Sequence, residues 1–129
     1  MSIVHIRHLI YHTFDLPKQA ARLNIPIILS FHDFYFICPT IHLIDEKDNY
    51  CAGVCSNTEG ECRQPYNFSK KIPKLKNHWI NFWKKNVSLL FENIDYFITT
   101  SDFTKQVYIK NYPILKNKQF KIIKHGRDF

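Results

Sequence analysis

The stretch "PIILSFHDFYFICP" (residues 26–39) decides the fold class. Its first six residues are apolar apart from Ser30, which is typical of a strand buried on both faces. The strand does not turn at a Gly or Asn, as strands commonly do. It ends at His32-Asp33 and continues through three aromatic residues to Cys38-Pro39. A titratable pair and a cysteine therefore follow the point where a buried strand leaves its sheet.

The segments around this stretch alternate between strand and helix patterns. Short apolar segments predict three more strands, at residues 3–10, 95–100 and 120–126. Apolar residues at helical spacing predict three helices, at residues 14–24, 78–94 and 101–111. Asp15 is expected to cap the first helix with Pro17 in its first turn, and Ser101 or Asp102 to cap the third. Residues 33–75 show little periodicity and are expected to be irregular.

This alternation predicts an α/β fold, a Rossmann-like parallel sheet flanked by helices on both faces. In such sheets ligands bind beyond the carboxyl ends of the strands, where His32, Asp33, Ser101 and Gly126 all fall. Only three glycines are present, and they form neither G-x-G-x-x-G nor a P-loop. The pattern is typical of the later part of a doubly wound domain.

The seven histidines have different expected roles. His5 and His8 are three residues apart on a predicted strand, so they should face opposite sides and cannot share a metal ion. His8 and His12 could instead line a cleft near the end of that strand. His32 has the most suggestive place, followed at once by a carboxylate, although a merely hydrogen-bonded histidine is the alternative.

The formal charge of +7 is unevenly distributed along the 129 residues. Residues 1–69 have a net charge of −2 and residues 70–129 of +9. A basic half suits phosphate-bearing partners, anionic lipid or nucleic acid, but dispersed lysines more often form a solvated face. Because the sequence shows neither a signal peptide nor an apolar run long enough to span a membrane, we expect a cytoplasmic protein.

Four cysteines lie within 25 residues, spaced C-x12-C-x3-C-x6-C: Cys38, Cys51, Cys55 and Cys62. Four thiolates can complete a tetrahedral zinc site, which would fix an otherwise polar loop. Two disulfides are an alternative that the expected compartment opposes, and free thiols are another. The sequence favours a structural zinc among these three.

Three segments together resemble a known family: "VHIRHLIYHTFDLPKQAARLNIPIILSFHDFYFICPTIHLID" (4–45), "DYFITTS" (95–101) and "KIIKHGRDF" (121–129). They are similar, in the same order, to the acceptor-side N-terminal domain of family 4 glycosyltransferases of the GT-B fold. The subgroup with cysteines after "CP" is the most similar. The resemblance implies a retaining transfer of sugar from a nucleotide-sugar to a saccharide or lipid-linked acceptor, often in polysaccharide assembly.

The resemblance also assigns residues. His32 matches the histidine that lines the cleft near the transferred sugar, and His8 and Asp33 match neighbouring cleft positions. We therefore expect His32 and Asp33 to act in catalysis, and His8, His12, Ser101 and Gly126 to bind substrate. Gly126 and Asp128 match the linker to a second, donor-binding domain.

Two residues depart from the family pattern. Arg7 stands where a histidine is common, and Arg127 stands where a small apolar residue is common. These departures concern specificity more than family membership.

We therefore expect residues 1–129 to be a partial N-terminal GT-B domain with a Cys-rich loop at residues 38–62. The donor-binding C-terminal domain is expected to be absent, which would leave this chain inactive alone. Helix 78–94 is expected to leave Lys84 and Lys85 outside, where they could support peripheral contact with an anionic membrane at its inner face. The alternative is a small zinc-containing, basic nucleic-acid-binding module, which the expected burial of most aromatic residues weakens.

Overall fold

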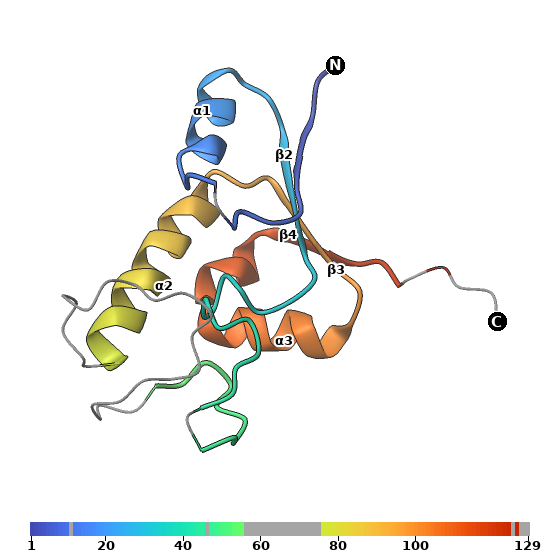
Figure 1. The fold of residues 1–129 in the computed structure, drawn as a ribbon. Coiled ribbons are helices and arrows are strands. Elements are labelled where there is room, and N and C mark those ends of the chain that lie inside the picture. The colour runs from blue at the N-terminus through green and yellow to red at the C-terminus, as the bar shows by residue number, and fades with distance from the viewer. Residues whose placement is uncertain (11, 46, 56–75, 125, 127–129) are drawn as a thin grey trace. The chain divides into compact units, whose positions relative to one another are not determined.

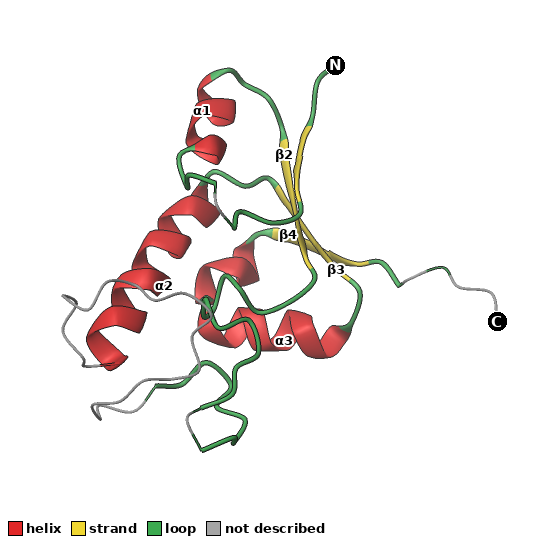
Figure 2. Cartoon of the chain, in the orientation of Figure 1, coloured by secondary structure: helices red, strands yellow, loops and turns green. Residues whose placement is uncertain are grey.

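The structure is a computed structural model that describes residues 1–10, 12–45, 47–55, 76–124 and 126, without the side chains of residues 76–79. The chain forms two compact units, which are considered separately: Met1–His32 with Ser88–Phe129, and Asp33–Val87. Figure 1 shows the ribbon and Figure 2 its helices and strands.

The first unit contains a parallel sheet in the order β1-β2-β3-β4. Its strands are β1 (Val4–Ile6), β2 (Ile27–Phe31), β3 (Tyr96–Thr99) and β4 (Gln119–Ile122). The helices of the chain are α1 (Leu16–Arg22), α2 (Lys76–Glu92), α3 (Asp102–Asn111) and the 3-10 helix η1 (Pro113–Asn117). The predicted α/β, Rossmann-like arrangement is confirmed.

Several predicted boundaries differ from the observed ones. β1 ends at Ile6 and β4 at Ile122, before the predicted ends at residues 10 and 126, although the N–H of Ile123 still donates to the carbonyl oxygen of Thr99 at 2.8 Å. Asp15 is the N-cap residue of α1, as predicted, although its side chain makes no capping hydrogen bond. Pro113 follows α3 and begins the 3-10 helix η1, which the sequence pattern did not indicate.

An aromatic cluster forms the core on one face of the sheet. Phe31 of β2 is 1% exposed, and its ring stacks on Tyr108 of α3 with a centroid distance of 3.6 Å. Phe91 of α2 meets it edge-on, and Phe97 of β3 and Phe120 of β4 complete the cluster. Large aromatic rings bury much apolar area, so this cluster supplies a large share of the stability of the first unit.

The opposite face of the sheet lacks this cover among the described residues. Tyr96 is 51% exposed and His5 is also exposed on that face. Within the first unit, Figure 1 shows α1 and α3 on one side of the strands, and the expected helical cover of the second face is not seen in the described residues of this unit. Each connection steps one strand in the same direction, and crossovers of one hand then place α1 and α3 on the same face.

The second unit joins the irregular segment after β2 to most of α2. Trp83 of α2 donates from Nε1 to the carbonyl oxygen of Phe36 at 3.3 Å, and its ring packs edge-on against Tyr35. Tyr35 and Phe36 are buried. This packing explains how a segment with little regular structure is held in a fixed course in the described residues.

Candidate functional site

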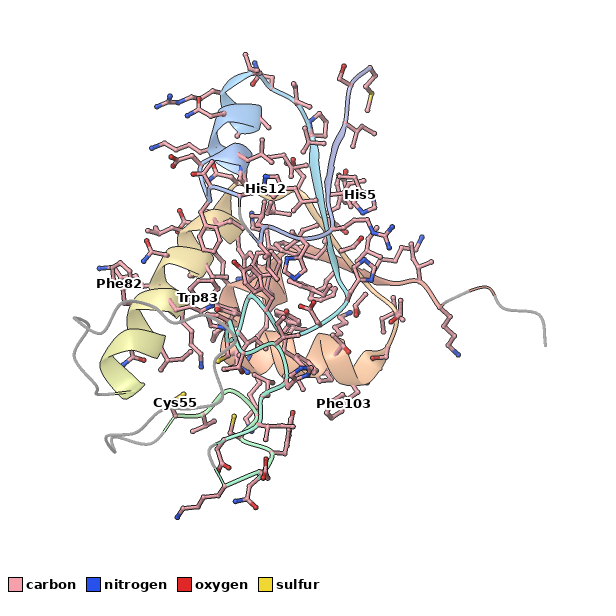
Figure 3. All side chains as sticks on the ribbon, viewed as in Figure 1. His5, His12, Cys55, Phe82, Trp83 and Phe103 are labelled. Atoms are coloured by element: carbon pink, nitrogen blue, oxygen red, sulfur yellow. The ribbon has the colours of Figure 1, made fainter. Side chains whose placement is uncertain are left out.

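Two side-chain pairs link β1 to β2 on the sheet face opposite the aromatic cluster. A hydrogen bond of 2.7 Å joins Nε2 of His5 to Oγ of Ser30. Two residues further along each strand, Nε of Arg7 donates to Nε2 of His32 at 3.3 Å. Both pairs have a sequence separation of 25, because the β1–β2 register continues past the last ladder pair. In Figure 3, His5 lies beside the strands on the side away from the helices.

His32 lies at the carboxyl end of an inner strand, and its side chain is exposed. Its Nε2 accepts a hydrogen bond from a guanidinium, so the ring proton belongs on Nδ1. The imidazole is therefore neutral in this arrangement. His32 lies at the carboxyl end of β2, as the sequence predicted, and its predicted roles in the cleft and in catalysis stay predictions.

Asp33 begins the second unit and has a defined local role. Its Oδ1 accepts a hydrogen bond from the backbone N–H of Tyr35 at 2.8 Å, which forms a turn typical of Asp. The side chain is half-buried. This bond fixes the start of the segment that leads to Cys38, and the proposed catalytic role of Asp33 stays a prediction.

The histidines that follow β1 differ in their surroundings. His8 is half-buried, and its Nδ1 accepts from the backbone N–H of Ile10 at 2.9 Å, so its proton belongs on Nε2. His12 is exposed, and Figure 3 shows it near α1, well away from His5 in the view. Their predicted roles in binding substrate stay predictions.

Two further predicted binding residues lie after β3 and β4. Ser101 caps α3: its Oγ accepts from the backbone N–H of Thr104 at 3.2 Å and donates to Oγ1 of Thr104 at 2.9 Å. The capping prediction for Ser101 is confirmed. Gly126 is exposed, and a Cβ added there would meet no atom within 4 Å. Asp128 and Arg127 lie outside the described residues.

The cysteine segment of the second unit has a buried thiol and a tight turn. Cys38 is 8% exposed, and its Sγ accepts a hydrogen bond from Oγ1 of Thr40 at 3.3 Å. Between Cys51 and Cys55 the chain reverses through two left-handed residues, Ala52 (φ 50°) and Gly53 (φ 77°). The N–H of the next residue, residue 54, donates to the carbonyl oxygen of Cys51 at 2.8 Å and closes the turn.

Lys84 connects α2 to this turn, donating from Nζ to the carbonyl oxygen of Gly53 at 2.6 Å. Burial lowers the pKa of Lys84, and the nearby thiols of Cys55, Cys38 and Cys51 act in the opposite direction. The prediction that Lys84 stays outside is therefore wrong, whereas Lys85 is exposed as expected.

Burial also raises the pKa of the Cys38 thiol, which keeps it protonated. Cys38, Cys51 and Cys55 are free thiols in the structure, and Cys62 lies outside the described residues. Within the described part of the chain, no group of three His, Cys, Asp or Glu side chains is arranged to hold a metal ion. The predicted zinc site stays a prediction.

The parallel sheet and its helices define a Rossmann-like domain, and sheets of this kind bind ligands beyond the carboxyl ends of their strands. No helix within the described residues is long and apolar enough to cross a membrane. The family model of Glycosyltransferase Family 4 matches residues 1–129. The chain therefore belongs to glycosyltransferase family 4, as the resemblance of its motifs predicted. Comparison with curated proteins and with solved structures finds no match to this chain.

Sequence reasoning missed two residues that the structure connects to these sites. Arg7 was visible only as a departure from the family pattern, and its contact with His32 depends on strand register. Lys84 was assigned to the polar side of α2, although it contacts the Cys51–Cys55 turn. A signal that could have identified Arg7 is its spacing of two from His5, because residues two apart on a strand lie on the same face.

Proposed function

We propose that this chain forms the acceptor-side half of a retaining glycosyltransferase. It would help to move a sugar from a nucleotide-sugar to a saccharide or lipid-linked acceptor, in the assembly of a polysaccharide or glycoconjugate. The donor's nucleotide would be held mainly by a second domain, so the chain would not transfer sugar alone. The site of action would be the cytoplasm, at or near the inner face of the membrane.

The observation that carries this proposal is the exposed imidazole of His32 at the carboxyl end of β2. A sugar transfer develops positive charge on the ring and negative charge on the departing diphosphate. A neutral imidazole next to the ring can orient hydroxyl groups without adding a charge that opposes the reaction. Hydrogen bonding to Arg7 supports this neutral form.

A binding experiment separates this proposal from one in which the chain acts alone. Calorimetry of the chain with several nucleotide-sugars should detect no binding tighter than roughly the millimolar range, because a cleft between two domains needs both walls. Adding a family donor-binding domain, fused or in trans, should restore transfer, and NMR of the product should show a retained anomeric configuration. A micromolar constant for the chain alone, or an inverted product, would contradict the proposal.

A structural zinc in the Cys-rich segment is a second part of the proposal. The turn between Cys51 and Cys55 and the burial of Cys38 support a loop organised around its thiols, with Cys62 predicted as the fourth ligand. Metal analysis of protein purified without chelator should give about one zinc per chain. Absence of metal together with four freely titrating thiols would remove this part and leave the transferase proposal untouched.

Peripheral membrane contact through α2 is a third part of the proposal. Phe82 is 69% exposed and Leu89 52% exposed on α2, with exposed Lys85 between them. Flotation with liposomes should show more binding when anionic lipid is included, and Lys85→Gln should reduce it. Equal binding to neutral and anionic liposomes would contradict membrane contact through this helix.

The nucleic-acid alternative gains no support from the first unit. Stacking on bases needs exposed rings, whereas the rings of its central cluster are buried, among them Phe31, Phe91, Phe97 and Tyr108.

A further inference from the structure

We propose that Arg7 binds a phosphate group of the substrate, with its guanidinium anchored on His32 at the carboxyl edge of the sheet. That this phosphate belongs to a substrate of sugar transfer rests on the proposed function. The shared chemistry is a diphosphate, which either a nucleotide-sugar donor or a lipid-linked acceptor could supply.

The position of Arg7 follows from the backbone and does not depend on a flexible loop. Arg7 is the first residue after β1, and His32 is the first residue after β2. The His5–Ser30 pair lies two residues before the Arg7–His32 pair on the same two segments and has the same sequence separation, so the sheet holds both pairs in register. Both Arg7 and His32 are exposed, which leaves the pair accessible to a ligand.

The hydrogen bond to His32 orients the guanidinium. It uses Nε, and within the described residues Nη1 and Nη2 of Arg7 make no hydrogen bond. These two nitrogens form the planar fork that binds phosphate oxygens in a bidentate manner. An arginine held at Nε loses less rotational freedom on binding than an unrestrained one, so the anchor favours the complex.

The charges on this face of the sheet also favour an anion. The strand residues that share the face are His5, Ile28, Ser30, Tyr96, Ile98, Gln119 and Lys121. None of them is acidic, and Lys121 adds a second positive charge. A phosphate at Arg7 would therefore meet no carboxylate from these strand positions, and the positive potential would assist its approach.

Binding can be measured on the chain itself with inorganic pyrophosphate as the probe. Histidine ring ¹⁵N NMR reports the tautomer of His32, and a titration followed on its ring signals gives a dissociation constant. We expect the Nδ1–H tautomer in the free protein and a constant on the order of millimolar for this exposed site. Addition of salt should weaken the binding.

Two substitutions at position 7 and a matched control test the assignment. Arg7→Gln should weaken pyrophosphate binding about tenfold or more and shift His32 toward a mixture of tautomers. Arg7→Lys keeps the charge but loses the fork, and should recover only part of the affinity. Lys121→Gln removes one charge from the same face and should change binding less than about threefold. We expect unchanged melting temperatures for all three variants, which would exclude a folding defect, because the side chains of Arg7 and Lys121 are both exposed.

The source of the phosphate is distinguished by two further titrations, one with a nucleoside diphosphate and one with a short, water-soluble prenyl diphosphate. Tighter binding of the nucleoside diphosphate would identify the donor as the source of the phosphate, and tighter binding of the prenyl diphosphate would identify the acceptor. Loss of that preference in Arg7→Gln supports the proposal. The inference is overturned if Arg7→Gln binds pyrophosphate as well as the unmodified chain, or if Lys121→Gln weakens binding equally. These results do not depend on sugar transfer, so they can fail while the proposed function stands.

Discussion

Replacing Phe31 by alanine tests whether the aromatic cluster is the main support of the sheet and of its carboxyl edge. The side chain is 1% exposed, stacks on Tyr108 at 3.6 Å and lies 5.7 Å from both Phe91 and Phe97. Removing a buried phenylalanine costs about 3–5 kcal/mol through lost burial and the cavity that remains. Because several ring contacts disappear together, we expect a loss of about 4 kcal/mol in the free energy of unfolding.

Urea unfolding, followed by circular dichroism, measures this loss, provided that the slope with denaturant is unchanged. Phe103→Ala is the matched control, because Phe103 lies on α3 with 61% of its side chain exposed and should cost less than about 0.5 kcal/mol. Figure 3 shows Phe103 directed away from the rest of α3. A loss below about 1.5 kcal/mol for Phe31→Ala, or equal losses for both variants, would refute the assigned core.

Three further predictions concern individual side chains. In the complete two-domain enzyme, His32→Ala should lower turnover about a hundredfold or more with an unchanged melting temperature, as steady-state kinetics and thermal unfolding would show; full activity would contradict its role. Ser101→Ala should cost about 1 kcal/mol in urea unfolding, because the N–H of Thr104 loses its capping partner, whereas Ser101→Asp should retain most of the stability. In reduced, chelator-treated protein, Cys38 should be alkylated more slowly than the same cysteine in the unfolded chain, because burial raises its pKa. As pH rises, the Cys38 thiol is deprotonated in the unfolded chain at a lower pH than in the folded one, so the contribution of this thiol to the free energy of unfolding should be lost above the ordinary thiol pKa. Mass spectrometry of the alkylated peptides at several pH values measures the reactivity of the thiol.

The order of strands and helices was predictable because each local pattern agrees with the tertiary packing. Residues 27–31 form β2 because their apolar side chains suit burial. Ser101 caps α3 through a hydrogen bond with a residue only three positions further along the chain. Such short-range rules need no knowledge of distant neighbours. The strand at residues 3–10 was overestimated, since the pattern cannot show where its partner strand ends.

Features that depend on strand order or register were not predictable from periodicity. The alternation of strands and helices fits both one-sided and two-sided sheets, and it is the observed strand order that places α1 and α3 on one face. The contact of Arg7 with His32 spans 25 residues and depends on how β1 and β2 align. The burial of Lys84 depends on the Cys51–Cys55 turn, whose two left-handed residues leave no periodic signal.

The packing of β2 also determines the chemistry of its end. Successive side chains of a strand point to opposite faces, so burying Leu29 and Phe31 against the helices directs Ser30 and His32 to the other face. A shift of one residue in register would exchange these sets, placing an imidazole in the aromatic core and a phenylalanine beside Arg7. The cost of that exchange includes the burial of Phe31, so the energy that folds the sheet also fixes His32 at the edge. For this reason the aromatic cluster and the Arg7–His32 pair should be retained or lost together.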